Sequence, residues 1–173
     1  DEYGENVRGQ GWFKVDNFRI EKVGYTADDA LSVLAHYVNQ MNQYIENEDL
    51  MSKVIYDLVE NKVEELGEYD ESNSQAEINA AILLAKDLLV AMDRSVKLYA
   101  KLGQALAEAD ENLSIYGDLP GAGEYSDVMM EVLDKYEYGE YTDDEIPGVI
   151  AMLEEALETC KKSEILVGKD ITY

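Results

Sequence analysis

Apart from its carboxylates, this chain has few residues that could do chemistry. His36 is its only histidine and Cys160 its only cysteine, so multi-cysteine zinc sites and the paired histidines of di-iron bundles are excluded. Cys160 continues an apolar stripe, which favours a small buried side chain over a nucleophile. The sequence has no GxxxxGK[ST] phosphate loop, GxSxG turn or HExxH helix. We therefore predict that the protein is not an enzyme.

Three consecutive acidic residues, Asp143, Asp144 and Glu145, stand where a helix is expected to begin. Carboxylate oxygens are the ligands that calcium prefers, although the spacing of a calcium-binding loop is absent. The expectation is a protein without a cofactor, with these three side chains as the calcium candidates in the helical part of the chain.

Tyrosine is abundant, with 13 residues. Tyr116, Tyr125, Tyr138 and Tyr141 lie at expected loops and helix ends, where each ring offers an apolar body and a polar tip to a glycan or a protein. The favoured interpretation is that these rings fill the junctions between helices and keep their hydroxyl groups in water. Ligand binding through them is the alternative.

The charge of the chain is strongly negative. Lys and Arg number 14 against 38 Asp and Glu, which gives a formal net charge of −24. Such a surface repels phosphate backbones and anionic lipid headgroups, so nucleic acid and membrane surfaces are disfavoured as partners. No run of 18 apolar residues is present, and membrane insertion is not expected.

The strongest structural signal is a helical stripe in residues 74–113. Its apolar positions are spaced by three or four: Ile78, Ile82, Ala85, Leu89, Met92, Val96, Tyr99, Leu102, Leu106, Ala109 and Leu113. This spacing predicts one continuous helix of roughly 40 residues and about 60 Å. Ser74 followed by Glu77 predicts a capping box at its start.

Further helices are expected on both sides of this one. Residues 27–66 predict another helix of about 40 residues, kinked or broken near the polar stretch 46–49. Two shorter helices follow the glycine-rich loop 117–123: one ends near Gly139, and the next opens with Thr142 and Glu145 as a capping box. The predicted fold is all-α, an elongated antiparallel bundle of three to four helices over residues 25–163.

The two ends of the chain differ from this pattern. Residues 11–23 and 165–173 are rich in aromatic and β-branched residues and predict short strands. The expected organisation is a strand-like flank at 1–24, the bundle, and a strand-like tail at 164–173. A lone strand must pair with something, either the other end of this chain or a sheet outside it.

The run GWFKVDNFRI at 11–20 resembles the closing strand of a galactose-binding-like β-sandwich, a type of carbohydrate-binding module in secreted multi-modular proteins of gut bacteria. The tail GKDITY at 168–173 is similar to the phrase that opens such modules. Residues 138–161, with GEYTDDEI before a regular helix, resemble the FIVAR-type helical modules found between carbohydrate-active domains. The resemblance implies an extracellular, cell-surface or periplasmic setting in bacteria. It also implies a structural calcium role for Asp16.

These observations lead to a first hypothesis of a non-catalytic helical spacer or interaction module associated with carbohydrate handling. Its expected partners are neighbouring modules of the same polypeptide, and also a protein or a glycan. The alternatives are a glycan- or protein-binding module that uses the loop tyrosines and a self-contained bundle of unrelated role. Three full-length helical arms would place the two ends of the bundle far apart. A tight hairpin at 139–142 would bring them together.

Overall fold

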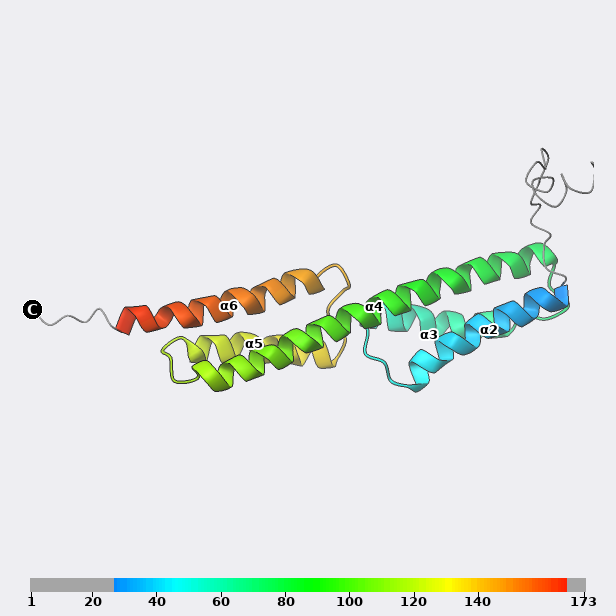
Figure 1. Ribbon diagram of the computed structural model, residues 1–173. Helices are drawn as coiled ribbons and strands as arrows, with labels where there is room; N and C mark the ends of the chain where they lie inside the picture. The colour runs from blue at the N-terminus through cyan, green and yellow to red at the C-terminus, as the bar shows by residue number, and fades with distance from the viewer. Residues whose placement is uncertain (1–26, 168–173) are drawn as a thin grey trace, which may run out of the picture.

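The computed structural model describes residues 27–167, and this part of the chain is all-α (Figure 1). Its helices are α2 (Ala27–Glu46), α3 (Lys53–Gly67), α4 (Gln75–Tyr116), α5 (Ala122–Glu137) and α6 (Ile146–Val167). The all-α prediction and the single helix of about 40 residues, which has 42, are confirmed. The expected total of three to four helices is too low for this range, because residues 27–66 form two helices and not one.

The two predicted terminal strands have different outcomes. The flank 1–24 lies outside the described residues. The tail strand was expected to begin at Ile165, but α6 continues through Val167, and only residues 168–173 lie outside the described range. A short apolar run is compatible with either a strand or the end of a helix, and here the preceding helix extends through it.

The helices form two units that share α4 (Figure 1). In the first unit, α2 and α3 pack against the N-terminal half of α4. In the second unit, α5 and α6 pack against its C-terminal half. α4 contacts all four of the other described helices, whereas α2 and α3 make no helix contact with α5 or α6. The described chain therefore begins at one end of an elongated molecule and stops at the other.

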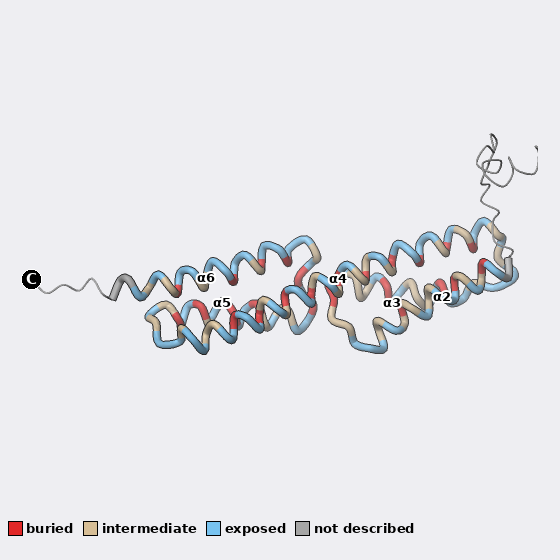
Figure 2. Tube along the Cα trace, in the orientation of Figure 1, coloured by how far each residue is buried: buried red, intermediate tan, exposed pale blue. Residues whose placement is uncertain are grey.

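Each unit has its own hydrophobic core, and Figure 2 shows buried positions along the inward faces of both halves. The core of the first unit contains Leu34, Met41, Met51, Val59, Leu66, Ala81, Ala85, Leu88 and Met92. The core of the second contains Tyr99, Leu102, Leu106, Ala109, Ala122, Tyr125, Met129, Val132, Tyr141, Ile146, Val149, Leu153 and Cys160. One stripe on α4 supplies both cores. This confirms the predicted periodicity, although Leu88 is buried more deeply than Leu89.

The break between α2 and α3 lies in the predicted polar stretch and has a packing reason. Leu50 packs against the core of the second unit, whereas the next residue, Met51, belongs to the core of the first. A helix cannot point two consecutive side chains in opposite directions, but an extended backbone does so at every step. Glu48 has a left-handed φ of 55° where the chain leaves α2.

The helix ends follow local rules. At the start of α4, Ser74 and Glu77 form the predicted reciprocal capping box. At the end of α5, Gly139 has φ +66°, and the amides of Gly139 and Glu140 donate to the carbonyls of Tyr136 and Lys135, as in a Schellman motif. The capping box predicted at Thr142 is only half formed. The Glu145 carboxylate accepts the Thr142 amide, but the Thr142 hydroxyl also donates to that carboxylate and caps no backbone amide.

Tyr99 marks the beginning of the second core on α4. It is fully buried, its hydroxyl donates to the Tyr141 carbonyl at 2.6 Å, and its ring stacks on Tyr136 with centroids 5.8 Å apart. Burial raises the pKa of Tyr99 to about 12. Ionisation of this phenol is therefore easier in the unfolded chain than in the folded one.

This difference predicts an alkaline loss of stability. Between pH 10 and 12 the unfolded chain loses the Tyr99 proton while the folded chain keeps it, so the free energy of unfolding falls as pH rises, by about 2 kcal/mol from this residue. We expect Tyr99→Phe to be about 1 kcal/mol less stable near pH 8, because the Tyr141 carbonyl loses its donor, and to lose less stability up to pH 12. Urea unfolding of both proteins from pH 8 to 12 measures both effects. If the free energy of unfolding fell equally with pH in the two proteins, the alkaline loss could not be assigned to Tyr99.

Candidate functional site: the junction of the two units

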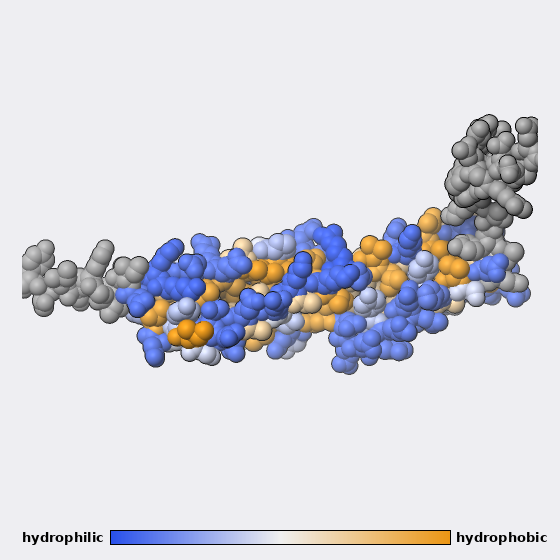
Figure 3. Space-filling view, in the orientation of Figure 1, coloured by the Kyte–Doolittle hydropathy of each residue, from blue (hydrophilic) through white to orange (hydrophobic). Residues whose placement is uncertain are grey.

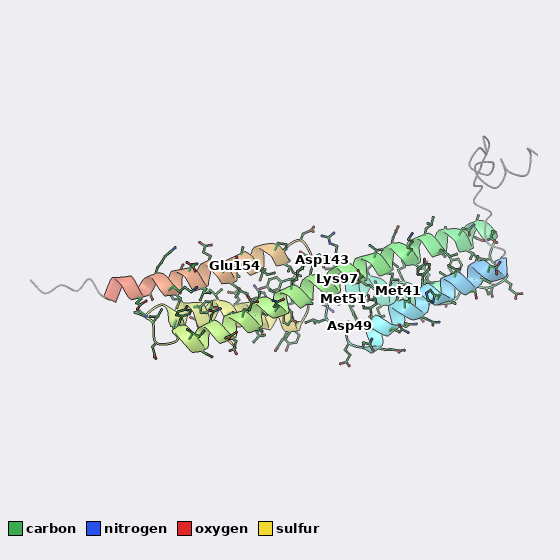
Figure 4. All side chains as sticks on the ribbon, in the orientation of Figure 1. Met41, Asp49, Met51, Lys97, Asp143 and Glu154 are labelled. Atoms are coloured by element: carbon green, nitrogen blue, oxygen red, sulfur yellow. The ribbon has the colours of Figure 1, made fainter. Side chains whose placement is uncertain are left out.

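The junction of the two units is the part of the molecule where most long-range polar contacts meet. It is built from the linker 47–52 between α2 and α3, the middle of α4, and the linker 138–145 between α5 and α6. Figure 4 shows Asp49, Met51, Lys97 and Asp143 gathered around the middle of α4, although they come from three separate stretches of sequence.

The Ser95 hydroxyl is at the centre of the junction. Ser95 is 0% exposed although it is polar. Its Oγ accepts the Ser52 backbone N–H at 2.9 Å and donates to Asp143 Oδ1 at 2.6 Å. One buried hydroxyl thus joins both linkers to α4. Its hydrogen is donated to one linker, and its oxygen accepts a hydrogen bond from the other.

Arg94 extends this network toward the solvent. Its Nη2 donates to Asp144 Oδ1 at 3.0 Å, and its Nε lies 3.8 Å from Asp143 Oδ2. The Arg94 side chain is 62% exposed, so these pairs orient the linker more than they stabilise the fold.

The three calcium candidates of this linker do not converge on one point. Asp143 and Asp144 face Arg94, while Glu145 turns back to Thr142, whose backbone N–H and hydroxyl lower the pKa of the Glu145 carboxyl. Within residues 27–167 no group of three or more His, Cys, Asp or Glu side chains could hold a metal ion. Asp16, the fourth candidate, lies outside the described residues.

The first residue of α3 and the linker 138–145 also contact each other directly. The Lys53 amide donates to the Gly139 carbonyl at 2.7 Å. A Cβ atom at Gly139 would lie 2.6 Å from the Met51 carbonyl oxygen, closer than any side chain tolerates. Glycine is therefore required at this position both for its left-handed backbone and for the approach of the other linker.

The four tyrosine candidates do not form one surface. Tyr125 and Tyr141 are 2% and 8% exposed and belong to the second core. Tyr116 is half-buried, with the Lys161 ammonium 5.3 Å from its ring centroid. Tyr138, beside the junction, is 68% exposed. Tyr116 and Tyr125 lie at the other end of the second unit, where α4 stops and α5 begins.

The remaining reactive residues are far apart. His36 is exposed on α2, and Cys160 is 1% exposed on α6, so the expectation that Cys160 is a buried side chain is confirmed. Because α2 and α6 do not contact each other, these residues cannot form a dyad. The sequence pattern did not predict that Ser52 and Ser95 are buried, because a polar residue within a helical stripe is usually expected to face solvent.

Several shallow hollows line the surface of the described chain. The largest of those compared, about 450 Å³, lies between α2 and α4. There the Tyr44 hydroxyl donates to Asp93 at 3.4 Å, and Lys97 donates to the same carboxylate at 2.6 Å, so these polar groups satisfy one another. A second hollow, of about 350 Å³, lies at the junction itself.

Comparison with known proteins gave no match to a protein-family model, a curated protein or a solved structure. Among residues 27–167, no helix is both long and apolar enough to cross a membrane.

The first prediction from the junction concerns Ser95. Ser95→Ala leaves the buried Ser52 N–H without an acceptor and removes the donor to Asp143, so we expect a loss of about 1–3 kcal/mol in the free energy of unfolding. Ser114→Ala is the matched control, because Ser114 is an exposed serine of the same helix that bonds only to the Asp110 carbonyl. Urea unfolding should show a change within about 0.5 kcal/mol for this control. Equal effects of the two substitutions would refute the role of Ser95.

The second prediction concerns Gly139. Gly139→Ala places a Cβ against the Met51 carbonyl oxygen at a left-handed backbone position, so we expect a loss of about 1–3 kcal/mol in unfolding free energy. Gly148→Ala, in α6, meets no atom within 4 Å and should be neutral or stabilise by about 0.5–1 kcal/mol. Thermal melts of both variants check this, and a stable Gly139→Ala protein would be inconsistent with the linker contact.

Proposed function

We propose that this chain is a non-catalytic helical spacer that holds the segments on its two sides at opposite ends of a stiff rod. The observation that carries the proposal is the unbroken course of α4 through both units, with the described chain beginning at one end of the molecule and stopping at the other (Figure 1). At a rise of 1.5 Å per residue, α4 alone spans about 60 Å.

The packing supports stiffness along this length. A long helix alone would bend, but each half of α4 is covered by two further helices with their own core. The weakest point is the middle, where the covering helices of the first unit stop and those of the second begin. The hydrogen bonds of Ser95 and the contact from Lys53 to Gly139 lie at this point.

The charge of the surface is consistent with a spacer that does not associate with other copies of itself. The visible face is largely hydrophilic, with apolar patches along the seam between the helices of the second unit and over α4 of the first (Figure 3), and the net charge is −24. Charge of one sign at this density opposes association between copies of the rod.

The setting we propose is a bacterial extracellular, cell-surface or periplasmic protein associated with carbohydrate handling. The support is the resemblance of the two ends and of residues 138–161 to modules of such proteins. The partners would then be the neighbouring modules of the same polypeptide. The positions of the described ends favour this role over a self-contained bundle whose two ends meet.

The experiment is a distance measurement between spin labels in the full chain. Cys160→Ala removes the native thiol, and Ser32→Cys on α2 and Lys162→Cys on α6 place labels on exposed positions near the two ends. We expect a narrow distribution near 60 Å, because α4 fixes the separation. A broad distribution, or a mean below about 40 Å, would contradict a stiff spacer. Adding Ser95→Ala should broaden the distribution, whereas adding Ser114→Ala should not.

A further inference from the structure

Two tyrosines line the junction hollow of about 350 Å³. It lies between the linker 47–52 and the end of α5, and Tyr56 of α3 and Tyr138 line it together with the linker backbone. Tyr138 is the most exposed of the large hydrophobic side chains in the described part of the chain. The backbone beside it is held, because the carbonyl of the next residue, Gly139, accepts the Lys53 amide. A ring that stands in water on an anchored backbone is available to a partner.

The same hollow is negatively charged. Glu48, Asp49 and Glu137 line it, and none of their carboxylates forms an ion pair within the described residues. Lys53 is the only cation among the lining residues, and Asp57 already holds its ammonium at 3.2 Å. The hollow therefore combines aromatic rings with carboxylates that form no ion pair in the described part of the chain.

A guanidinium group matches both features. It stacks on aromatic faces and donates paired hydrogen bonds to carboxylates, which a compact ammonium does less well. Anionic ligands are opposed by three carboxylates and by the net charge of the chain. We propose that this hollow receives an arginine side chain from a basic segment of a partner protein. The net charge of −24 would speed the encounter with such a segment.

The location gives this contact a structural effect. Asp49 belongs to the linker of the first unit and Tyr138 to that of the second, so one bound arginine touches both units. The contact goes beyond the spacer role, and either one can hold without the other.

The test is a titration of the isotope-labelled full chain followed by NMR. The probe is a synthetic acetylated peptide amide, Gly-Arg-Gly-Arg-Gly, and its control is the same peptide with citrulline, which keeps the shape and removes the charge. We expect the arginine peptide to bind more tightly and to shift amide signals in residues 48–56 and 137–139. Tyr138→Ala and Tyr56→Ala should each weaken binding about three- to tenfold.

Matched variants separate the hollow from the overall charge. The two tyrosine substitutions leave the net charge unchanged, and Ile115→Ala, which removes an exposed side chain at the far end of α4, should have no effect. Glu137→Gln should weaken binding, whereas Glu111→Gln, an exposed acid far from the junction, should not. Thermal melts check that each variant is folded. If Tyr56→Ala does not fold, Tyr138→Ala and Glu137→Gln are enough to test the proposal. Absence of binding, or equal losses for Glu137→Gln and Glu111→Gln with no loss for Tyr138→Ala, would overturn the proposal.

Discussion

The arrangement of the two units depends on the hydrogen bonds of the Ser95 hydroxyl, a buried group in the middle of α4. α2 and α3 do not contact α5 or α6, so among residues 27–167 only α4 and the two linkers join the halves. The hydroxyl accepts the Ser52 amide of one linker and donates to the Asp143 carboxylate of the other. A buried polar group is costly without partners, so this position favours the arrangement in which both linkers are in place.

Sharing one helix between two cores imposes a second constraint. The buried residues of α4 must recur every three or four positions from Ile78 to Ala109, because both units draw on them. Where the first core ends at Met92 and the second begins at Tyr99, a polar residue can be accommodated, since no helix covers both sides of that point. The linker between α2 and α3 covers this part of α4. Its adjacent side chains pack into different cores, Leu50 into the second and Met51 into the first.

The sequence predicted those parts of the fold that local rules determine. The stripe of α4, its capping box at Ser74, and the interruption after Glu46 follow from periodicity, side-chain capping and polar composition. A break near residues 46–49 was predicted, but its packing cause was not, because Leu50 packs against a core formed by residues distant in the sequence while Met51 belongs to the other core. Ser95 was missed for the same reason: its partners come from linkers 43 and 48 residues away. Among the tyrosines, periodicity could not distinguish the buried Tyr125 from the exposed Tyr138, since both stand near helix ends.

Because α4 is continuous, the number of residues between the two units also determines the angle between them. Each residue of an α-helix advances about 1.5 Å and turns about 100°. One residue added between Met92 and Tyr99 would therefore lengthen the molecule only slightly, but would rotate the second unit relative to the first by about 100°, a little over a quarter of a turn. Two or three added residues would give other settings, and about seven would nearly restore the original one. The two ends of the described chain, at the start of α2 and the end of α6, thus have a definite relative orientation as well as a separation.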